Sequence, residues 1–174
     1  MATATQQLQG TYVLDPIHSS ASFAVKHMVV STFRGRFEKF DATLTDGKLV
    51  GTVDVGSIVV KDENLAAHLK SPDFFDTERF PEIAFTSTEL DLDGERLTLK
   101  GELTMRGVTK PVEATGTIQG PTEDFMGNTR LGFTLETKVD RTEFGVSWNA
   151  DLPKGGKALS DEVTLIVELE FHKA

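Results

Sequence analysis

Apolar residues alternate with polar or small residues along most of this chain, and a period of two predicts β-strands with one apolar face. The alternation is clearest near the C-terminus, where every second position is apolar: Val163, Leu165, Val167, Leu169 and Phe171. Similar segments lie at residues 12–14, 21–29, 33–37, 40–44, 53–59, 83–92, 97–105, 112–118 and 131–139. About eight antiparallel strands joined by short turns predict an all-β sandwich or closed barrel.

The segment from residue 62 to residue 80 interrupts the alternation and predicts a short helix. Asp62 has a side chain suited to a helix N-cap, Glu63 suits the first turn and Lys70 suits the last. The next three residues, 71–73, then have the pattern of a second helix start, with a serine cap followed by proline and an acid.

The predicted helix has one apolar face, and a cluster of phenylalanines follows it. The face is formed by Leu65, His68 and Leu69. The cluster consists of Phe74, Phe75 and Phe80. Such a segment either plugs the end of an ordinary core or closes the mouth of a ligand cavity, and the sequence pattern leaves both interpretations open.

Length and composition limit the class of protein. The 174 residues predict one domain, residues 11–174, after a disordered polar tail, residues 1–10. A net charge of −9 disfavours nucleic acid and anionic membranes as partners, although it does not exclude a local basic patch. No segment approaches the roughly 20 apolar residues that span a bilayer, and the N-terminus lacks the pattern of a secretory signal. We therefore expect a cytoplasmic protein without a transmembrane segment.

The sequence contains no recognisable catalytic motif. There is no cysteine, no Gly-x-Ser-x-Gly elbow, no His-Glu-x-x-His and no glycine-rich phosphate loop. The segment from Asp15 to Ser19 resembles a serine hydrolase site only superficially, and turn hydrogen bonds around Pro16 are the better interpretation. We expect no catalytic residue and no metal site.

Four residues have a structural and a functional interpretation. His27 continues an apolar strand face, so it is either a core histidine or a group that bonds a ligand head group or a buried acid. His68 on the predicted helix has the same two interpretations. Arg141 either pairs with neighbouring acids at a barrel rim or binds an anion. Trp148 either covers a cavity mouth or anchors its loop.

Several motifs, taken together and in order, resemble the YceI-like family of polyisoprenoid-binding proteins. They are Tyr12-x-Leu14-Asp15-Pro16-x-His18-Ser19, Phe23-x-Val25-x-His27, Gly35-x-Phe37, His68-Leu69-Lys70-Ser71-x-Asp73-Phe74-Phe75-Asp76, Phe80-Pro81, Phe85-x-Ser87, Gly101-x-Leu103-Thr104-x-Arg106-Gly107-Val108-Thr109 and Asp140-Arg141-x-x-Phe144-Gly145. The resemblance runs from about Tyr12 to Phe171, and it is specific because the motifs occur in register.

The resemblance implies an extended, lipocalin-like antiparallel barrel of about eight strands, with a pore that holds a long isoprenoid or similar lipid. It also implies a homodimer without established catalysis and without a cofactor other than the lipid. Many family members carry a secretory signal, and the absence of one here is typical of the cytoplasmic members.

The predicted ligand-binding residues combine the apolar pattern with this resemblance. The pore lining is predicted to be Phe23, Val25, Phe33, Phe37, Phe40, Phe85, Leu103 and Phe133. One end is closed by Phe74, Phe75 and Phe80, and the head group is reached by His27, His68 or Arg141. The set is completed by Leu69, Phe144 and Trp148. Two alternatives stay open: a ligandless, stress-related interaction module with a side-chain-filled barrel, and a small-molecule enzyme that uses His27 or His68.

Overall fold

The computed structural model of the chain describes residues 8–174. Most of the predicted polar tail, residues 1–7, lies outside the described residues. Leu8 is only 1% exposed, and the N–H of Gly10 donates to Asp46 Oδ1 over 2.8 Å. Residues 8–10 therefore belong to the folded structure, and the predicted disorder does not hold for them, because an apolar side chain there joins the core.

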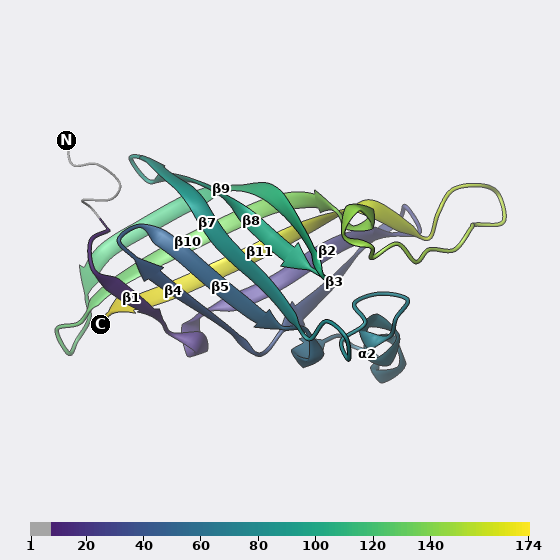
Figure 1. The fold of residues 1–174 in the computed structure, drawn as a ribbon, viewed down its shortest axis with the longest axis horizontal. Coiled ribbons are helices and arrows are strands. Elements are labelled where there is room, and N and C mark those ends of the chain that lie inside the picture. Colours follow the sequence, from purple (N-terminus) through teal and green to yellow (C-terminus); the bar gives the residue numbers. More distant parts are fainter. Residues whose placement is uncertain (1–7) are drawn as a thin grey trace.

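The described residues form a long β-barrel with one short helix at its side (Figure 1). The strands are β1 (Thr11–Leu14), β2 (Ser20–His27), β3 (Ser31–Phe37), β4 (Phe40–Thr45), β5 (Lys48–Asp54), β6 (Ile58–Val59), β7 (Glu82–Asp93), β8 (Arg96–Met105), β9 (Val108–Glu123), β10 (Thr129–Asp140) and β11 (Leu159–Lys173). The helix is α2 (Glu63–Lys70), and the 3₁₀ turns are η1 (Pro16–His18), η2 (Val55–Ser57) and η3 (Arg141–Phe144). No helix among residues 8–174 is long and apolar enough to cross a membrane.

The barrel closes because β11 pairs with two different strands along the same edge. Its first part pairs antiparallel with β2, and its last residues pair with β1. The sheet order β1-β4-β5-β7-β8-β9-β10-β11 therefore returns to β1, while β2, β3 and β6 extend the wall beyond the closed ring. The predicted all-β antiparallel barrel is confirmed, and closure removes the exposed edges of the ring strands, which would favour aggregation.

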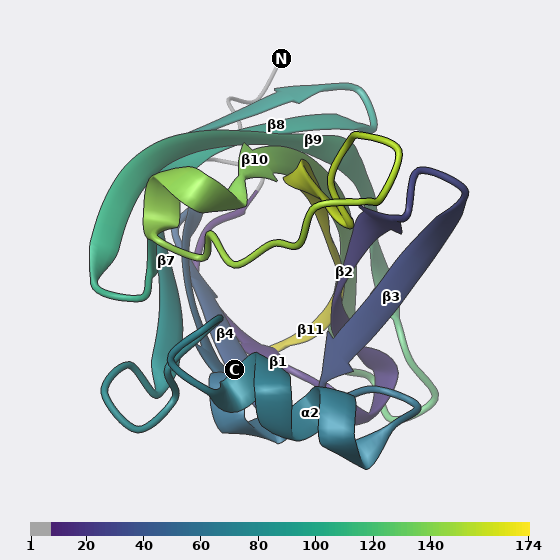
Figure 2. The ribbon, with the colours of Figure 1, turned by 90° about the vertical axis from the view of Figure 1, so that its right-hand side faces the viewer.

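The helix occupies a position where no strand closes the wall. Asp62 caps α2 by accepting from the N–H of Leu65, as its side chain predicts. In the end-on view of Figure 2, α2 lies between β3 and the β4 and β7 side of the barrel. The ring of Phe75, which follows α2, packs against Phe23 and Phe37 of β2 and β3. The helix and the segment after it thus lie at one end of the barrel and complete the wall around the barrel interior there.

Local details differ from the alternation pattern where backbone geometry overrides it. The chain reverses between β2 and β3 with positive φ at Met28 and Val29, so the strand predicted to continue to Val29 ends at His27. The second helix start predicted at residues 71–73 is a turn in which Ser71 O accepts two backbone N–H groups. In both places the chain forms a tight turn, although its residue types are also compatible with a strand or a helix.

The interior has a filled half and a hollow half. The filled half lies at the end of the barrel that holds β1 and the C-terminus (Figure 1). In its core the rings of Phe133 and Phe171 meet edge to face, with 5.6 Å between their centroids. A second cluster of buried residues surrounds the other half, beside α2. The barrel is therefore stabilised by a conventional core at one end, which leaves the other end free to hold a cavity.

Candidate functional site: an apolar cavity with a polar mouth

The hollow half of the barrel contains a cavity of about 540 Å³. Its walls come from β2, β3, β7, β8, β10, β11, α2 and the segments that follow α2 and β10. Eleven of the predicted ligand-binding residues line it: Phe23, Val25, His27, Phe33, Phe37, His68, Leu69, Phe74, Phe75, Arg141 and Trp148. Most of this lining is apolar, so the cavity is suited to an apolar ligand with a few polar contacts.

Phenylalanine rings form the inner wall of the cavity. The ring centroid of Phe23 lies 6.1 Å from that of Phe33 and 5.8 Å from that of Phe37. Phe37 also meets Phe75 edge to face at 6.2 Å. Gly35 makes this arrangement possible, since a Cβ at that position would lie 2.5 Å from the Phe23 ring. The cavity therefore depends on a glycine whose missing side chain leaves room for a neighbouring ring.

A second, smaller cavity of about 170 Å³ continues toward the filled half. Phe40, Phe85 and Leu103 line this second cavity, as predicted for the pore. Phe37 borders both cavities, as do Ile83 and Leu165. These shared side chains show that the two cavities adjoin each other.

The mouth of the cavity combines aromatic rings with a histidine–aspartate pair. His68 on α2 packs edge to face against both Phe74 and Trp148, with 4.9 Å between centroids in each case. Its Nε2 lies 2.9 Å from Asp73 Oδ2. Helix α2 positions the histidine, while the turn after it carries the aspartate. Trp148 thus covers part of the mouth, and His68 places a polar group beside an otherwise apolar opening.

Arg141 holds the loop that carries Trp148. Its guanidinium donates from Nη1 to the carbonyl oxygens of Val146 (2.7 Å) and Trp148 (2.9 Å), and from Nε to that of Ser160 (2.9 Å). Nη2 makes no hydrogen bond within the described residues; Asp161 Oδ1 lies 4.0 Å away. Burial lowers the pKa of Arg141 from its usual value. Backbone carbonyls thus use Nη1 and Nε, while Nη2 of this cavity-lining residue has, among the described residues, only the distant carboxylate of Asp161 nearby.

Some sequence-based assignments differ from the observed positions. His27 is exposed at the rim of the cavity, so the interpretation as a core histidine is wrong: β2 ends there and the chain turns into solvent. Phe133 and Phe144 line neither of these two cavities, because both are packed inside the clusters of buried residues. Phe80 also lies outside them and packs against Gly107 and the Arg79 guanidinium.

The sequence reasoning missed several lining residues. They are Leu65, Ile83, Met105, Val139, Val146, Leu159, Val163 and Leu165. The alternation in β11 pointed to Val163 and Leu165 as inward-facing. The alternation did not show which inward positions lie in the hollow half. That depends on where along β11 the partner strand changes from β2 to β1.

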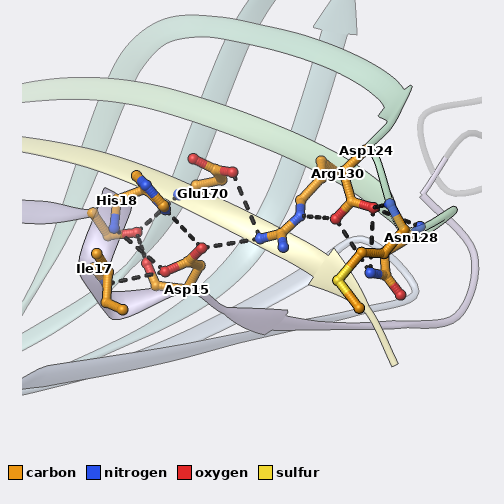
Figure 3. Close-up of polar contacts among 9 residues, drawn as sticks. Asp15, Ile17, His18, Asp124, Asn128, Arg130 and Glu170 are labelled. Atoms are coloured by element: carbon orange, nitrogen blue, oxygen red, sulfur yellow. Dashed lines mark hydrogen bonds and ion pairs between the residues drawn. The ribbon is translucent and has the colours of Figure 1, made fainter.

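A polar cluster on the barrel exterior includes the segment once compared with a hydrolase site (Figure 3). Asp15 Oδ2 lies 2.9 Å from His18 Nδ1. The hydroxyl of Ser19 instead donates to the carbonyl of Asp15, and it accepts from the N–H of Glu170. The predicted turn hydrogen bonds around the proline are confirmed, and the serine hydroxyl is engaged by the backbone.

The same cluster contains ligand types that suit a metal ion, namely Asp15, His18 and Glu170. Arg130 Nη1, however, lies 2.9 Å from Asp15 and 3.6 Å from Glu170, so a cation already neutralises these carboxylates. Asp124 Oδ2 accepts a hydrogen bond from Nε of the same arginine. Backbone and side-chain hydrogen bonds hold the pKa of Asp124 well below its usual range. This arrangement is that of a structural ion network.

The Asp15–His18 pair predicts a pH dependence of stability. The hydrogen bond with Asp15 raises the pKa of His18, and that with His18 lowers the pKa of Asp15. The histidine contribution is complete below about pH 6.5 and is lost as the pH rises through the raised pKa. The aspartate contribution is present above about pH 3.9 and is lost as the pH falls through the lowered pKa. The pair is thus expected to stabilise most between these limits.

Histidine titration by NMR tests this expectation in the parent and in Asp15→Asn. The substitution should bring the pKa of His18 back toward its ordinary value and flatten the thermal stability profile between pH 6 and 8, roughly the range in which histidine titrates. The pH-dependent part of the change in stability should be small, because His18 is exposed; the lost ion pair between Asp15 and Arg130 adds a part that does not vary over this pH range. An unchanged His18 titration in Asp15→Asn would show that the pair does not form in solution.

The fold and the site define a closed antiparallel β-barrel with an internal apolar cavity. The sequence matches the YceI-like domain over residues 12–171, and the chain therefore belongs to the YceI-like family. It is 34% identical over 160 residues to Protein YceI of Escherichia coli O157:H7, covering 88% of this chain and 81% of that protein.

Two solved structures share the fold. BcnA of Burkholderia cenocepacia superposes with a TM-score of 0.78 at 23% identity, covering 90% of this chain and 98% of BcnA. A polyisoprenoid binding domain of Saccharophagus degradans superposes with a TM-score of 0.73 at 14% identity, covering 94% and 98%. The predicted family resemblance is thus confirmed by sequence, and the predicted barrel by structural likeness.

Proposed function

We propose that the protein binds one long apolar chain inside the hollow half of the barrel, for storage or transport, without catalysis. The observation that carries this proposal is the cavity of about 540 Å³. Its volume lies in the range of about 300–1,000 Å³ that is typical of small-molecule sites. The apolar lining matches an alkyl or isoprenoid chain, whereas the filled half of the barrel blocks the opposite end.

Burial of the chain supplies enough free energy for useful affinity. Each buried methylene contributes about 0.8 kcal/mol, so ten contribute roughly 8 kcal/mol. Association costs several kcal/mol, so about twenty buried carbons reach micromolar affinity without a polar contact. The first cavity and its extension past Phe37 provide a path for such a chain. A site of this kind discriminates weakly between chains of similar width.

The class of lipid is assigned from the family, and the position of its head group from the residues at the cavity mouth. The Saccharophagus degradans domain, described as polyisoprenoid binding, supports an isoprenoid or a similar fatty chain as ligand. A head group would lie at the mouth beside His68, and Arg141 also lines the cavity, with Nη2 free of hydrogen bonds within residues 8–174. We propose that the protein binds no cofactor other than this lipid ligand. A cytoplasmic location stays a prediction from the sequence, and a homodimer stays one from the family resemblance.

The two alternative functions make different demands on the site. A ligandless barrel would need its interior filled by side chains, and the cavity argues against this. An enzyme would need a nucleophile or base, and the His68–Asp73 pair is the feature that favours it. If His68→Asn, in a folded protein, abolished a reproducible turnover of the bound molecule, the enzyme would become the better interpretation.

Mass spectrometry of lipid co-purified with the native protein identifies the natural ligand class directly. The single tryptophan, Trp148, then reports binding of oleate or geranylgeraniol to delipidated protein, because a chain that enters the mouth displaces water near its ring. We expect a blue shift of its emission that saturates at one chain per barrel.

The matched control is Phe125→Ala, which changes a fully exposed phenylalanine in the β9–β10 turn, at the other end of the barrel. It should bind both chains as the parent does. Absence of any co-purified lipid, together with an unchanged emission spectrum at saturating oleate and geranylgeraniol, would contradict the proposed function and favour the ligandless barrel.

A further inference from the structure

The turn between β2 and β3 carries three consecutive exposed apolar side chains. Met28, Val29 and Val30 are 42%, 76% and 86% exposed. The turn is a loop of three residues between the paired His27 and Ser31. Consecutive residues with positive φ in hairpin turns are normally Asn-Gly or Asp-Gly. Here Met28 and Val29 have φ values of 54° and 67°, and a branched side chain is rarely found in this conformation. These residues neither pack in the core nor suit the turn, so local folding does not explain them.

This apolar turn lies at the mouth of the cavity. The residues that flank it, His27 and Ser31, line the cavity. The N–H of Met28 donates to the carbonyl of Ala158, which also lines the cavity, over 2.7 Å. Figures 1 and 2 show the turn and the loop before β11 at the same end of the barrel. Whatever the apolar turn contacts is therefore brought next to the cavity opening.

The hairpin behind the turn is basic, although the chain as a whole is acidic. Between Asp15 and Glu38 the sequence has no acidic residue, in a chain of net charge −9. Lys26, Arg34 and Arg36 are exposed. They alternate with cavity-lining residues of β2 and β3, so they face outward. An apolar tip with a basic flank has the chemistry of an interfacial membrane anchor.

We propose that the turn Met28–Val30, with the basic outer face of β2 and β3, docks the protein on the surface of an anionic lipid bilayer. The apolar side chains enter the headgroup boundary, while Lys26 and Arg34, the cations nearest the turn, contact lipid phosphates. The overall negative charge repels other orientations, so docking is tip first and presents the cavity mouth to the bilayer. The docking explains how a chain is loaded, and in that respect it rests on the proposed function.

Vesicle co-sedimentation tests the docking. The full chain is mixed with vesicles of phosphatidylcholine alone, or of phosphatidylcholine with phosphatidylglycerol. The parent should sediment with the anionic vesicles and be released at high salt. The double variant Val29→Asp/Val30→Asp should bind at least about tenfold more weakly, and Lys26→Gln/Arg34→Gln should lose its preference for the anionic vesicles. Aspartate accepts positive φ more readily than valine, so the first variant should fold.

The matched control is the other apolar turn, Phe125→Asp/Met126→Asp, at the opposite end of the barrel. Phe125 and Met126 are also fully or largely exposed, but Glu123 and Asp124 precede them. This variant should sediment as the parent does. Failure of the parent to bind anionic vesicles, or equal losses for the two turn variants, would overturn the docking.

The Trp148 titration with submicellar oleate separates this proposal from the proposed function. Tip variants that lose vesicle binding but keep the oleate response support docking as a separate surface. A parent that binds oleate but no vesicles contradicts the docking alone. A parent that binds vesicles through the tip but not oleate contradicts the proposed function alone.

Discussion

Phe37→Asp is expected to abolish binding of long-chain ligands while Phe37→Leu preserves it. Phe37 borders both cavities, and its ring contacts Phe23 and Phe75. A chain that passes this position would strip water from the new carboxylate. Because neutralising an aspartate at pH 7 costs about 4 kcal/mol, affinity should fall on the order of 100- to 1,000-fold.

The pH dependence of the Phe37→Asp variant gives a second reading. Protonation of the carboxyl removes most of the penalty, so binding should partly return as the pH falls toward about 4. Phe37→Leu, which keeps the wall apolar, should bind within a few-fold of the parent. Trp148 emission measures affinity, and circular dichroism verifies the β-fold. If Phe37→Asp does not fold, Phe33→Asp places the charge at a less buried wall position of the same cavity.

Tight binding by a folded Phe37→Asp or Phe33→Asp variant at pH 7 would place the chain outside this cavity. The assignment of the site to the hollow half would then be wrong, even if the protein binds lipid. Equal losses in Phe37→Leu and Phe37→Asp would indicate that shape, rather than charge, governs binding at this position.

The barrel was predictable from sequence because its causes are local and repeated. Alternation in β11 and in β8 reports which face of each strand is buried. The sequence also has Asp46-Gly47 and Asp93-Gly94, a dipeptide typical of hairpin turns, where the chain reverses. The family motifs added closure, which alternation alone does not distinguish from a sandwich. The cap of α2 was also predictable, since an aspartate N-cap acts within one turn.

The division of the interior was not predictable from sequence, because it depends on distant pairings. Phe133 and Phe37 both alternate inward, but only Phe37 lies where β2 and β3 extend the wall beyond the closed ring. Likewise, His27 continues an apolar face in sequence, although β2 ends there. Such positions are set by how β11 divides its edge between β1 and β2.

Arg141→Met is expected to lower the free energy of unfolding by about 3–5 kcal/mol. The guanidinium is 6% exposed and donates to the carbonyl oxygens of Val146, Trp148 and Ser160. Methionine fills part of the volume but leaves these carbonyls without donors. Arg141→Lys should be nearly as damaging, because one ammonium cannot reproduce the geometry of a planar guanidinium. Chemical denaturation measures the loss.

Arg141→Met should weaken ligand binding more than a substitution elsewhere that lowers the free energy of unfolding by the same amount. The Trp148 carbonyl is one of its acceptors, and the Trp148 ring covers the mouth beside His68. Without the arginine, the loop should move, Trp148 emission should shift to the red and chain release should accelerate. Arg34→Met is the matched control: Arg34 is exposed and has no hydrogen bond or ion pair within residues 8–174, so its change should stay within about 0.5 kcal/mol. An Arg141→Met protein with parental stability and Trp148 emission would mean that the loop is held by other contacts.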